Sequence, residues 1–163
     1  MKTFKQFLKE AEDYRGGHTA PGPDSGSPMH DVSKNGTYPS DFYGKDGFRY
    51  YSDMGSEGNM DRESHDKVVK YKGKPDEHVW IHRAIPKSVY TKAMRQKKEP
   101  PIRQMIRKGD WVTINKNYAK DHGEANLNGD YKIASMRVPA SHIYTAGDSI
   151  HEWGYHPPDE KTD

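Results

Sequence analysis

The stretch VWIHRAI at residues 79–85 decides how this chain folds. Apolar and polar residues alternate over part of it, and Pro75 and Pro86 stand on either side. A short run rich in β-branched and aromatic residues, bounded by chain breakers, is typical of a strand. The sequence therefore predicts a core strand here, with Arg83 lying between Ile81 and Ile85 along it.

Further strand and turn signals lie downstream of this stretch. The dipeptide Asn128-Gly129 is typical of a turn, and the segment after it has strand character. The segments that combine β-branched and aromatic residues are 111–114, 131–138 and 142–145. Each is short, and turn residues separate them, so we expect strands that pair mostly in an antiparallel way.

Helical segments separate the first strands. We expect helices over 61–71, over 88–98 and from Asn115 onward, with 102–106 as a short connection. The expected N-caps are Asp61, Ser88 and Asn115. The expected ends are Gly73, Pro100-Pro101 and His122-Gly123. Helices followed by several short strands predict an α+β fold with a largely antiparallel sheet.

Composition limits the classes of function. Of 163 residues, 31% are hydrophobic and 31% are charged, so the core must be small. The formal net charge of +2 gives no strong attraction to nucleic acid or to an anionic membrane. The absence of cysteine excludes disulfides, thiolate zinc sites and cysteine nucleophiles, and it suits a reducing cytoplasm. No apolar run is long enough to cross a bilayer, and we expect no membrane partner.

The chain divides into four segments. Residues 1–12 form an amphipathic helical pattern too short to be stable alone. Residues 13–60 are rich in turn residues but carry many aromatic rings, so we expect a loop-rich wrap pinned to the domain. The folded core is expected over 61–157, followed by a polar tail at 158–163. The rings expected to pin the wrap are Tyr38, Phe42, Tyr43, Phe48, Tyr50 and Tyr51.

Three polar side chains stand in apolar surroundings. Arg83 would be costly to bury unpaired, so it should meet a phosphate or a carboxylate, and Glu152 is one candidate. Glu152 precedes Trp153 and must be paired, hydrogen-bonded or kept for function. The hydroxyl of Thr113 either holds a carboxylate in place or faces a neighbouring strand.

The nine histidines do not form a clear metal-binding pattern. His78 and His82 lie four apart, but on a strand they do not converge as a helical pair does. His151 and His156 have no third ligand nearby in sequence. We expect no metal site, and we place the following at the surface or in loops: His18, His30, His65 and His142.

Four stretches carry a resemblance to a known family. They read GGHTAPGPDSGSP at 16–28, VWIHRAIP at 79–86, KGDWVTINKNYAKDHGE at 108–124 and RVPASHIYTAGDSIHEWGY at 137–155. The region from 78 to 157 resembles the ADP-ribosyltransferase-like domains of phage polyvalent and head-associated proteins. That resemblance implies a split antiparallel β core with flanking helices, NAD⁺ as the substrate and no metal.

The resemblance also implies roles for individual residues. The family's strand arginine maps onto Arg83, which would bind the NAD⁺ phosphates and orient the nicotinamide ribose. The family's hydroxyl residue maps onto Thr113, which would position the catalytic acid, and that acid maps onto Glu152. The residues expected to bind NAD⁺ are His82, Arg83, Ala84, Trp111, Thr113, Tyr118 and Tyr155.

The first residues resemble the capsid-targeting peptide of proteins packaged in the heads of T-even-type phages. Such peptides are cut after a glutamate that follows Leu or Ile by two positions, and Leu8-Lys9-Glu10 fits that pattern. This implies a prohead scaffold and protease as partners of residues 1–11. It also implies a place inside the phage head, then in the host bacterial cytoplasm, where an unidentified protein or nucleic acid would be modified.

One departure and two alternatives stay open. Many arginine-modifying relatives carry Glu or Gln two residues before the catalytic glutamate, and here that position is Ile150. His151 and Asp148 are nearby candidates for handling the acceptor. The first alternative is a non-catalytic internal head protein that keeps the fold as a binding or packing module. The second is a metal-independent ribonuclease that uses Glu152, Arg83 and a histidine.

Overall fold

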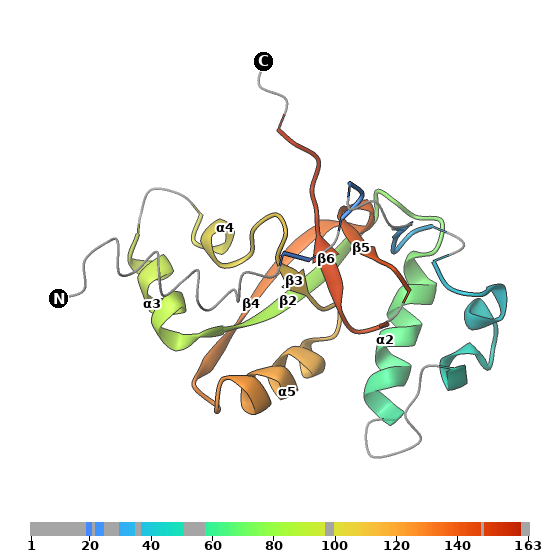
Figure 1. Ribbon diagram of the computed structural model, residues 1–163, viewed down its shortest axis with the longest axis horizontal. Helices are drawn as coiled ribbons and strands as arrows, with labels where there is room; N and C mark the ends of the chain where they lie inside the picture. The colour runs from blue at the N-terminus through green and yellow to red at the C-terminus, as the bar shows by residue number, and fades with distance from the viewer. Residues whose placement is uncertain are drawn as a thin grey trace.

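The computed structural model describes residues 19–20, 22–24, 30–34, 37–50, 58–96, 100–147 and 149–160. The capsid-targeting peptide predicted at 1–12 lies outside these ranges, as do parts of the predicted wrap and tail. Those predictions therefore stay predictions. Figure 1 shows the arrangement of the helices and strands in the described ranges.

Two antiparallel sheets form the framework. The two-stranded sheet pairs β2 (His78–Pro86) with β4 (Tyr131–Pro139). Its register runs from His78↔Pro139 to Pro86↔Tyr131. The other has the order β1-β5-β6-β3. Its strands are β1 (His30–Asp31), β5 (Ile143–Thr145), β6 (Trp153–Tyr155) and β3 (Trp111–Val112). The predicted α+β class, with antiparallel pairing, is confirmed.

The two sheets meet at one backbone bridge. The His82 N–H donates to the Thr113 carbonyl at 2.8 Å, and the Thr113 N–H donates to the His82 carbonyl at 2.9 Å. β2 therefore belongs to one sheet and touches the end of β3 in the other. This junction brings the residue after His82, which is Arg83, close to the segment that begins with Trp111.

Helices cover the sides of this framework. The α-helices are α2 (Gly58–Tyr71), α3 (Lys87–Arg95), α4 (Ile102–Met105) and α5 (Lys116–Asn126). Short 3₁₀ turns are η1 (Ser40–Tyr43), η2 (Gly47–Tyr50) and η3 (Ala140–His142). In Figure 1, α5 lies along one side of the β2–β4 ribbon, while α2 lies beyond β5 and β6.

Two predicted N-caps are wrong. α2 begins at Gly58, so Asp61 lies within its first turn, where it is 3% exposed and binds another side chain. α3 begins at Lys87, directly after Pro86, so Ser88 lies inside it. Asn115 does cap α5, because its side chain accepts a hydrogen bond from the Asn117 N–H at 3.0 Å.

Two helix boundaries also differ from prediction. The expected connection at 102–106 contains α4, which starts after Pro101, a position that proline favours because its fixed φ suits a first turn. The helix that starts after Asn115 does not end at Gly123 but continues to Asn126. Gly123 is buried there, and a Cβ at this position would meet the Tyr131 ring at 2.5 Å. The glycine permits close packing of α5 on β4 instead of ending the helix.

Aromatic side chains of the described wrap reach the core. Tyr38 and Phe42 are buried and stack with ring centroids 4.2 Å apart, and Tyr38 meets Trp153 edge-on at 6.4 Å. His65 was expected at the surface, but it is only 5% exposed and its Nε2 lies 2.6 Å from the Phe42 carbonyl oxygen. The core thus joins the wrap, α2 and the strand that follows Glu152.

Candidate active site

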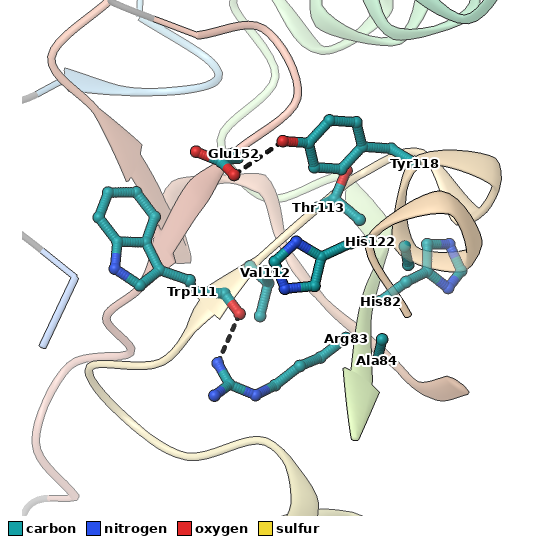
Figure 2. A pocket seen from close by; sticks show the side chains of 10 residues that line it. His82, Arg83, Ala84, Trp111, Val112, Thr113, Tyr118, His122 and Glu152 are labelled. Carbon is teal, nitrogen blue, oxygen red and sulfur yellow. Dashed lines mark hydrogen bonds between the residues drawn. The ribbon is translucent and has the colours of Figure 1, made fainter. Parts of the chain in front are cut away.

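A pocket of about 250 Å³ lies where the two sheets and α5 meet. β2, the segment from Trp111 to Thr113, α5 and the loop before β6 contribute its walls. Its lining residues are His82, Arg83, Ala84, Trp111, Val112, Thr113, Tyr118, Ala119, His122 and Glu152. Every residue predicted to bind NAD⁺ or to act in catalysis lines this pocket except Tyr155. Figure 2 shows Glu152 and Tyr118 on one side of the pocket and Arg83 on the other.

The Arg83 side is held by a carbonyl and a carboxylate. Arg83 Nη1 donates to the Trp111 carbonyl at 2.7 Å and lies 4.0 Å from Asp110 Oδ1 (Figure 2). The Arg83 side chain is 13% exposed and that of Asp110 is 8% exposed. The carboxylate partner that the sequence required is therefore Asp110, whereas Glu152 binds elsewhere. Both partners lie on the segment that the His82–Thr113 bridge draws against β2.

Thr113 and His82 form the inner wall. Thr113 is 4% exposed, and its Oγ1 accepts a hydrogen bond from the Asn115 N–H at 3.1 Å. His82 Nδ1 lies 2.7 Å from Ser135 Oγ. Burial, and after it the positive charges of Lys67 and Lys116, lower the pKa of His82 to about 4. The imidazole is therefore neutral at pH 7.

Glu152 is held on the opposite side by side chains. Its Oε1 accepts a hydrogen bond from the Tyr118 hydroxyl at 2.7 Å (Figure 2), and its N–H donates to Ser149 Oγ at 3.2 Å. Tyr118 comes from α5, whereas Ser149 belongs to the loop that carries Glu152. A hydroxyl donor stabilises the charged form of a carboxylate and fixes its direction. The glutamate expected to act in catalysis is thus held at the pocket by Tyr118, which the same resemblance placed among the NAD⁺-binding residues.

Four neighbours of the pocket were missed by sequence analysis. Val112 and Ala119 are small apolar lining residues, and Asp110 pairs with Arg83. His122 lies four residues after Tyr118 and thus on the same face of α5. The i,i+4 spacing from Tyr118 was a usable signal for His122, because the predicted helix already reached His122.

Tyr155 lies outside the described lining of the pocket. It is half-buried against the core, and this burial raises the pKa of its phenol. Successive side chains of a strand point to opposite faces, so Tyr155 shares the face of Trp153, which is fully buried. Glu152 precedes Trp153 and points the other way. The alternation rule, applied to 152–155, would have separated Tyr155 from the site.

His151, one of the two candidates for handling the acceptor, does not line the pocket. The ring nitrogens of His151 are both engaged, with Nε2 2.7 Å from Asp61 Oδ1 and Nδ1 2.8 Å from Ser64 Oγ. Asp148 lies outside the described residues. Ile150 is 2% exposed in the core, so this position cannot contact an acceptor.

The described residues contain neither a candidate metal site nor a candidate membrane span. Within those ranges, no group of three or more histidine or acidic side chains is placed to hold a metal ion. No helix among them has the length and apolar character to cross a membrane. Comparisons of the chain with protein-family models, with curated proteins and with solved structures gave no match.

Proposed function

We propose that the pocket binds the nicotinamide riboside end of NAD⁺ and that the protein is an NAD⁺-dependent mono-ADP-ribosyltransferase. The observation that carries the proposal is the juxtaposition of Arg83, Thr113 and Glu152 on the walls of one pocket. These residues lie 30 and 39 positions apart along the chain. The resemblance, which rests on sequence alone, assigns roles to the same three residues.

The electrostatics of the pocket fit this chemistry. When the nicotinamide–ribose bond breaks, its electron pair leaves with nicotinamide and positive charge develops on the ribose, as in glycoside hydrolysis. A fixed carboxylate such as Glu152 stabilises that charge more in the transition state than in the ground state. The lone pair of an acceptor then forms the new bond to the ribose carbon, and the acceptor loses a proton. Tyr118 holds the Glu152 carboxylate in place at 2.7 Å.

Arg83 fits the other end of the substrate. A guanidinium carries five donors in a planar fork and a permanent positive charge, which suits a diphosphate. Trp111 is 39% exposed beside it and offers an aromatic face at the rim of the pocket. A pocket of about 250 Å³ encloses only part of a dinucleotide, so the remainder would lie along the surface near this rim.

The test is nicotinamide release from NAD⁺ by the purified protein, with bacterial lysate added or withheld. Glu152→Gln should abolish most of the release, whereas Glu160→Gln, the same change at an exposed site in the C-terminal segment, should not. Dependence on lysate would place the acceptor in it. No release under either condition, with no NAD⁺-induced rise in Tm, would overturn the proposal and favour the non-catalytic head module.

In the ribonuclease alternative His82 cannot be the acid, which leaves His122 as the other histidine of the pocket lining. Acid–base cleavage of RNA needs a protonated group to assist the leaving oxygen near neutral pH. With a pKa lowered to about 4 by burial and two lysines, His82 cannot supply that proton at pH 7. Cleavage of RNA without NAD⁺, lost in Glu152→Gln, would support this alternative.

The phage setting is a separate proposal that rests on residues 1–11. If the protein is packaged in a phage head and processed, mass spectrometry of virion proteins should find a chain that begins at Ala11. An intact N-terminus on the virion protein would contradict processing after Glu10. The NAD⁺ chemistry does not depend on this result.

A further inference from the structure

A chain of side-chain contacts leads from α2 to the carboxylate of the pocket. Asp61 and Ser64 of α2 bind the two ring nitrogens of His151, at 2.7 Å and 2.8 Å. The His151 ring stacks on the Tyr118 ring, with centroids 4.7 Å apart and planes 6° apart. The Tyr118 hydroxyl in turn donates to Glu152 Oε1 at 2.7 Å. Three elements remote in sequence are joined in this way.

The hydrogen bonds around His151 are mutually consistent. The Asp61 carboxylate can only accept, so His151 Nε2 carries the proton and donates it. In the tautomer that leaves Nδ1 unprotonated, Nδ1 accepts from the Ser64 hydroxyl, and Ser64 Oγ accepts from Asn115 Nδ2 at 3.1 Å. Each hydrogen bond in this series thus pairs one donor with one acceptor. The ring plane of His151 is therefore fixed from two sides.

The backbone separates the roles of His151 and Glu152. They are adjacent in sequence, yet the imidazole reaches α2 while the carboxylate lines the pocket. Tyr118 contacts both, because its ring face lies on His151 and its hydroxyl meets Glu152. A phenol can rotate about its side-chain bonds, and a parallel ring held at 4.7 Å restricts that rotation.

We propose that His151 is a positioning residue for the reaction at Glu152. Held by Asp61 and Ser64, it keeps the Tyr118 ring in the one orientation that directs the hydroxyl at the Glu152 carboxylate. The role rests on the function proposed above. It also replaces the idea that His151 handles the acceptor, since neither ring nitrogen is available for that.

The test is a double-mutant cycle on the rate of nicotinamide release. Tyr118→Phe removes only the hydroxyl and should lower kcat by ~10- to ~100-fold with little change in KM, the range for a hydrogen bond to a charged group. His151→Gln removes the stacked ring and should lower kcat by up to about tenfold. The double variant should be no slower than Tyr118→Phe alone, because His151 acts through that hydroxyl.

The outcomes separate the two proposals. Losses that multiply in the double variant would mean that His151 acts independently of Tyr118, and they would overturn the positioning role alone. A wild-type protein that releases no nicotinamide would overturn the proposed function and this role with it. His78→Gln, a change of the same type at an exposed position on β2, is the control and should leave kcat unchanged.

A second variant, Ser64→Ala, tests the same role if His151→Gln fails to fold. Ser64→Ala removes one hydroxyl from the network and leaves the Asp61–His151 pair in place. It should lower kcat by less than His151→Gln, with the same lack of further loss in the Tyr118→Phe background. A full effect of Ser64→Ala in that background would contradict the positioning role as clearly as the first cycle.

Discussion

The two sides of the pocket are built in different ways. Arg83 sits in the middle of β2, where nine residue pairs with β4 and the bridge to Thr113 fix the backbone. Glu152 precedes β6, a strand of three residues. Its carboxylate is held by the Tyr118 hydroxyl, and the Tyr118 ring stacks on His151. One side depends on a continuous backbone ladder and the other on a few side-chain contacts.

This difference has a consequence for substitutions. Many backbone hydrogen bonds together fix the β2 backbone at Arg83. Substitutions on the exposed face of β2 should therefore leave the position of Arg83 unchanged. The position of Glu152 depends on single donors, each of which can be removed by one substitution. We expect effects on stability to be largest near β2 and effects on rate to be largest near Glu152.

The largest expected effect is on the rate of nicotinamide release, on the Glu152 side of the pocket. Glu152→Gln should lower kcat for nicotinamide release by ~10²–10³, the loss seen when one preorganised electrostatic group is removed. Arg83→Lys should act mainly on KM, because lysine keeps the charge but loses the planar fork. Steady-state kinetics over a range of NAD⁺ concentrations separates the two. If Arg83→Lys instead lowered mainly kcat, the proposed difference between the two sides of the pocket would be contradicted.

Substitutions in β2, on the Arg83 side of the pocket, should mainly change the free energy of unfolding. Ile81 is fully buried in β2, and Ile81→Ala should lower the free energy of unfolding by about 3 kcal/mol through lost burial and a cavity. Its neighbour Trp80 is 50% exposed, with Arg137 6.0 Å from its ring, so Trp80→Ala should cost less than about 1 kcal/mol. Urea unfolding of both variants checks the difference, and equal losses would contradict the assigned faces of β2.

The junction of the two sheets should be sensitive to acid through His82. Its pKa is lowered from 6.5 to about 4 in the folded protein, so between these pH values the unfolded chain binds a proton that the folded chain does not. Stability should therefore fall as pH drops through this window, by up to about 3 kcal/mol at its lower end.

Urea unfolding between pH 7 and pH 4 measures this dependence. His82→Gln removes the titrating group and should flatten the curve in that window. An unchanged slope in the variant would show that His82 is not the group responsible.

The smallest expected effect concerns the start of α5. Asn115→Ala removes the N-cap and the bond from Nδ2 to Ser64, and should cost about 1–2 kcal/mol in unfolding. Asn117→Ala removes only an exposed bond to Glu63 and should stay within about 0.5 kcal/mol. A shift in Tm as large for Asn117 as for Asn115 would argue against capping as the cause.

Local patterns in the sequence predicted much of the fold. The alternation at 79–85 predicted β2, and Asn128-Gly129 does form a turn, in which both residues have positive φ values of 51° and 75°. The caps at Asp61 and Ser88 were wrong because a capping residue type does not by itself mark where a helix begins. The end at Gly123 was wrong because that glycine serves tertiary packing against Tyr131.

The sequence by itself determined which residues could do chemistry. An arginine in an apolar strand, a glutamate among aromatic rings and a threonine before a helix are unusual because burying polar groups is costly. Their types and order also carried the resemblance. These are local properties, and they can be recognised before any contact is known.

Only the tertiary structure decided what those residues contact. Asp110 pairs with Arg83, and α2 reaches Glu152 through His151, whose partner Asp61 is 90 positions away. Contacts between segments so far apart depend on how the sheets and helices pack, which local sequence patterns do not encode. The physical reason is that strand and helix signals are local, whereas the pairing of buried polar groups is settled only when the whole core closes.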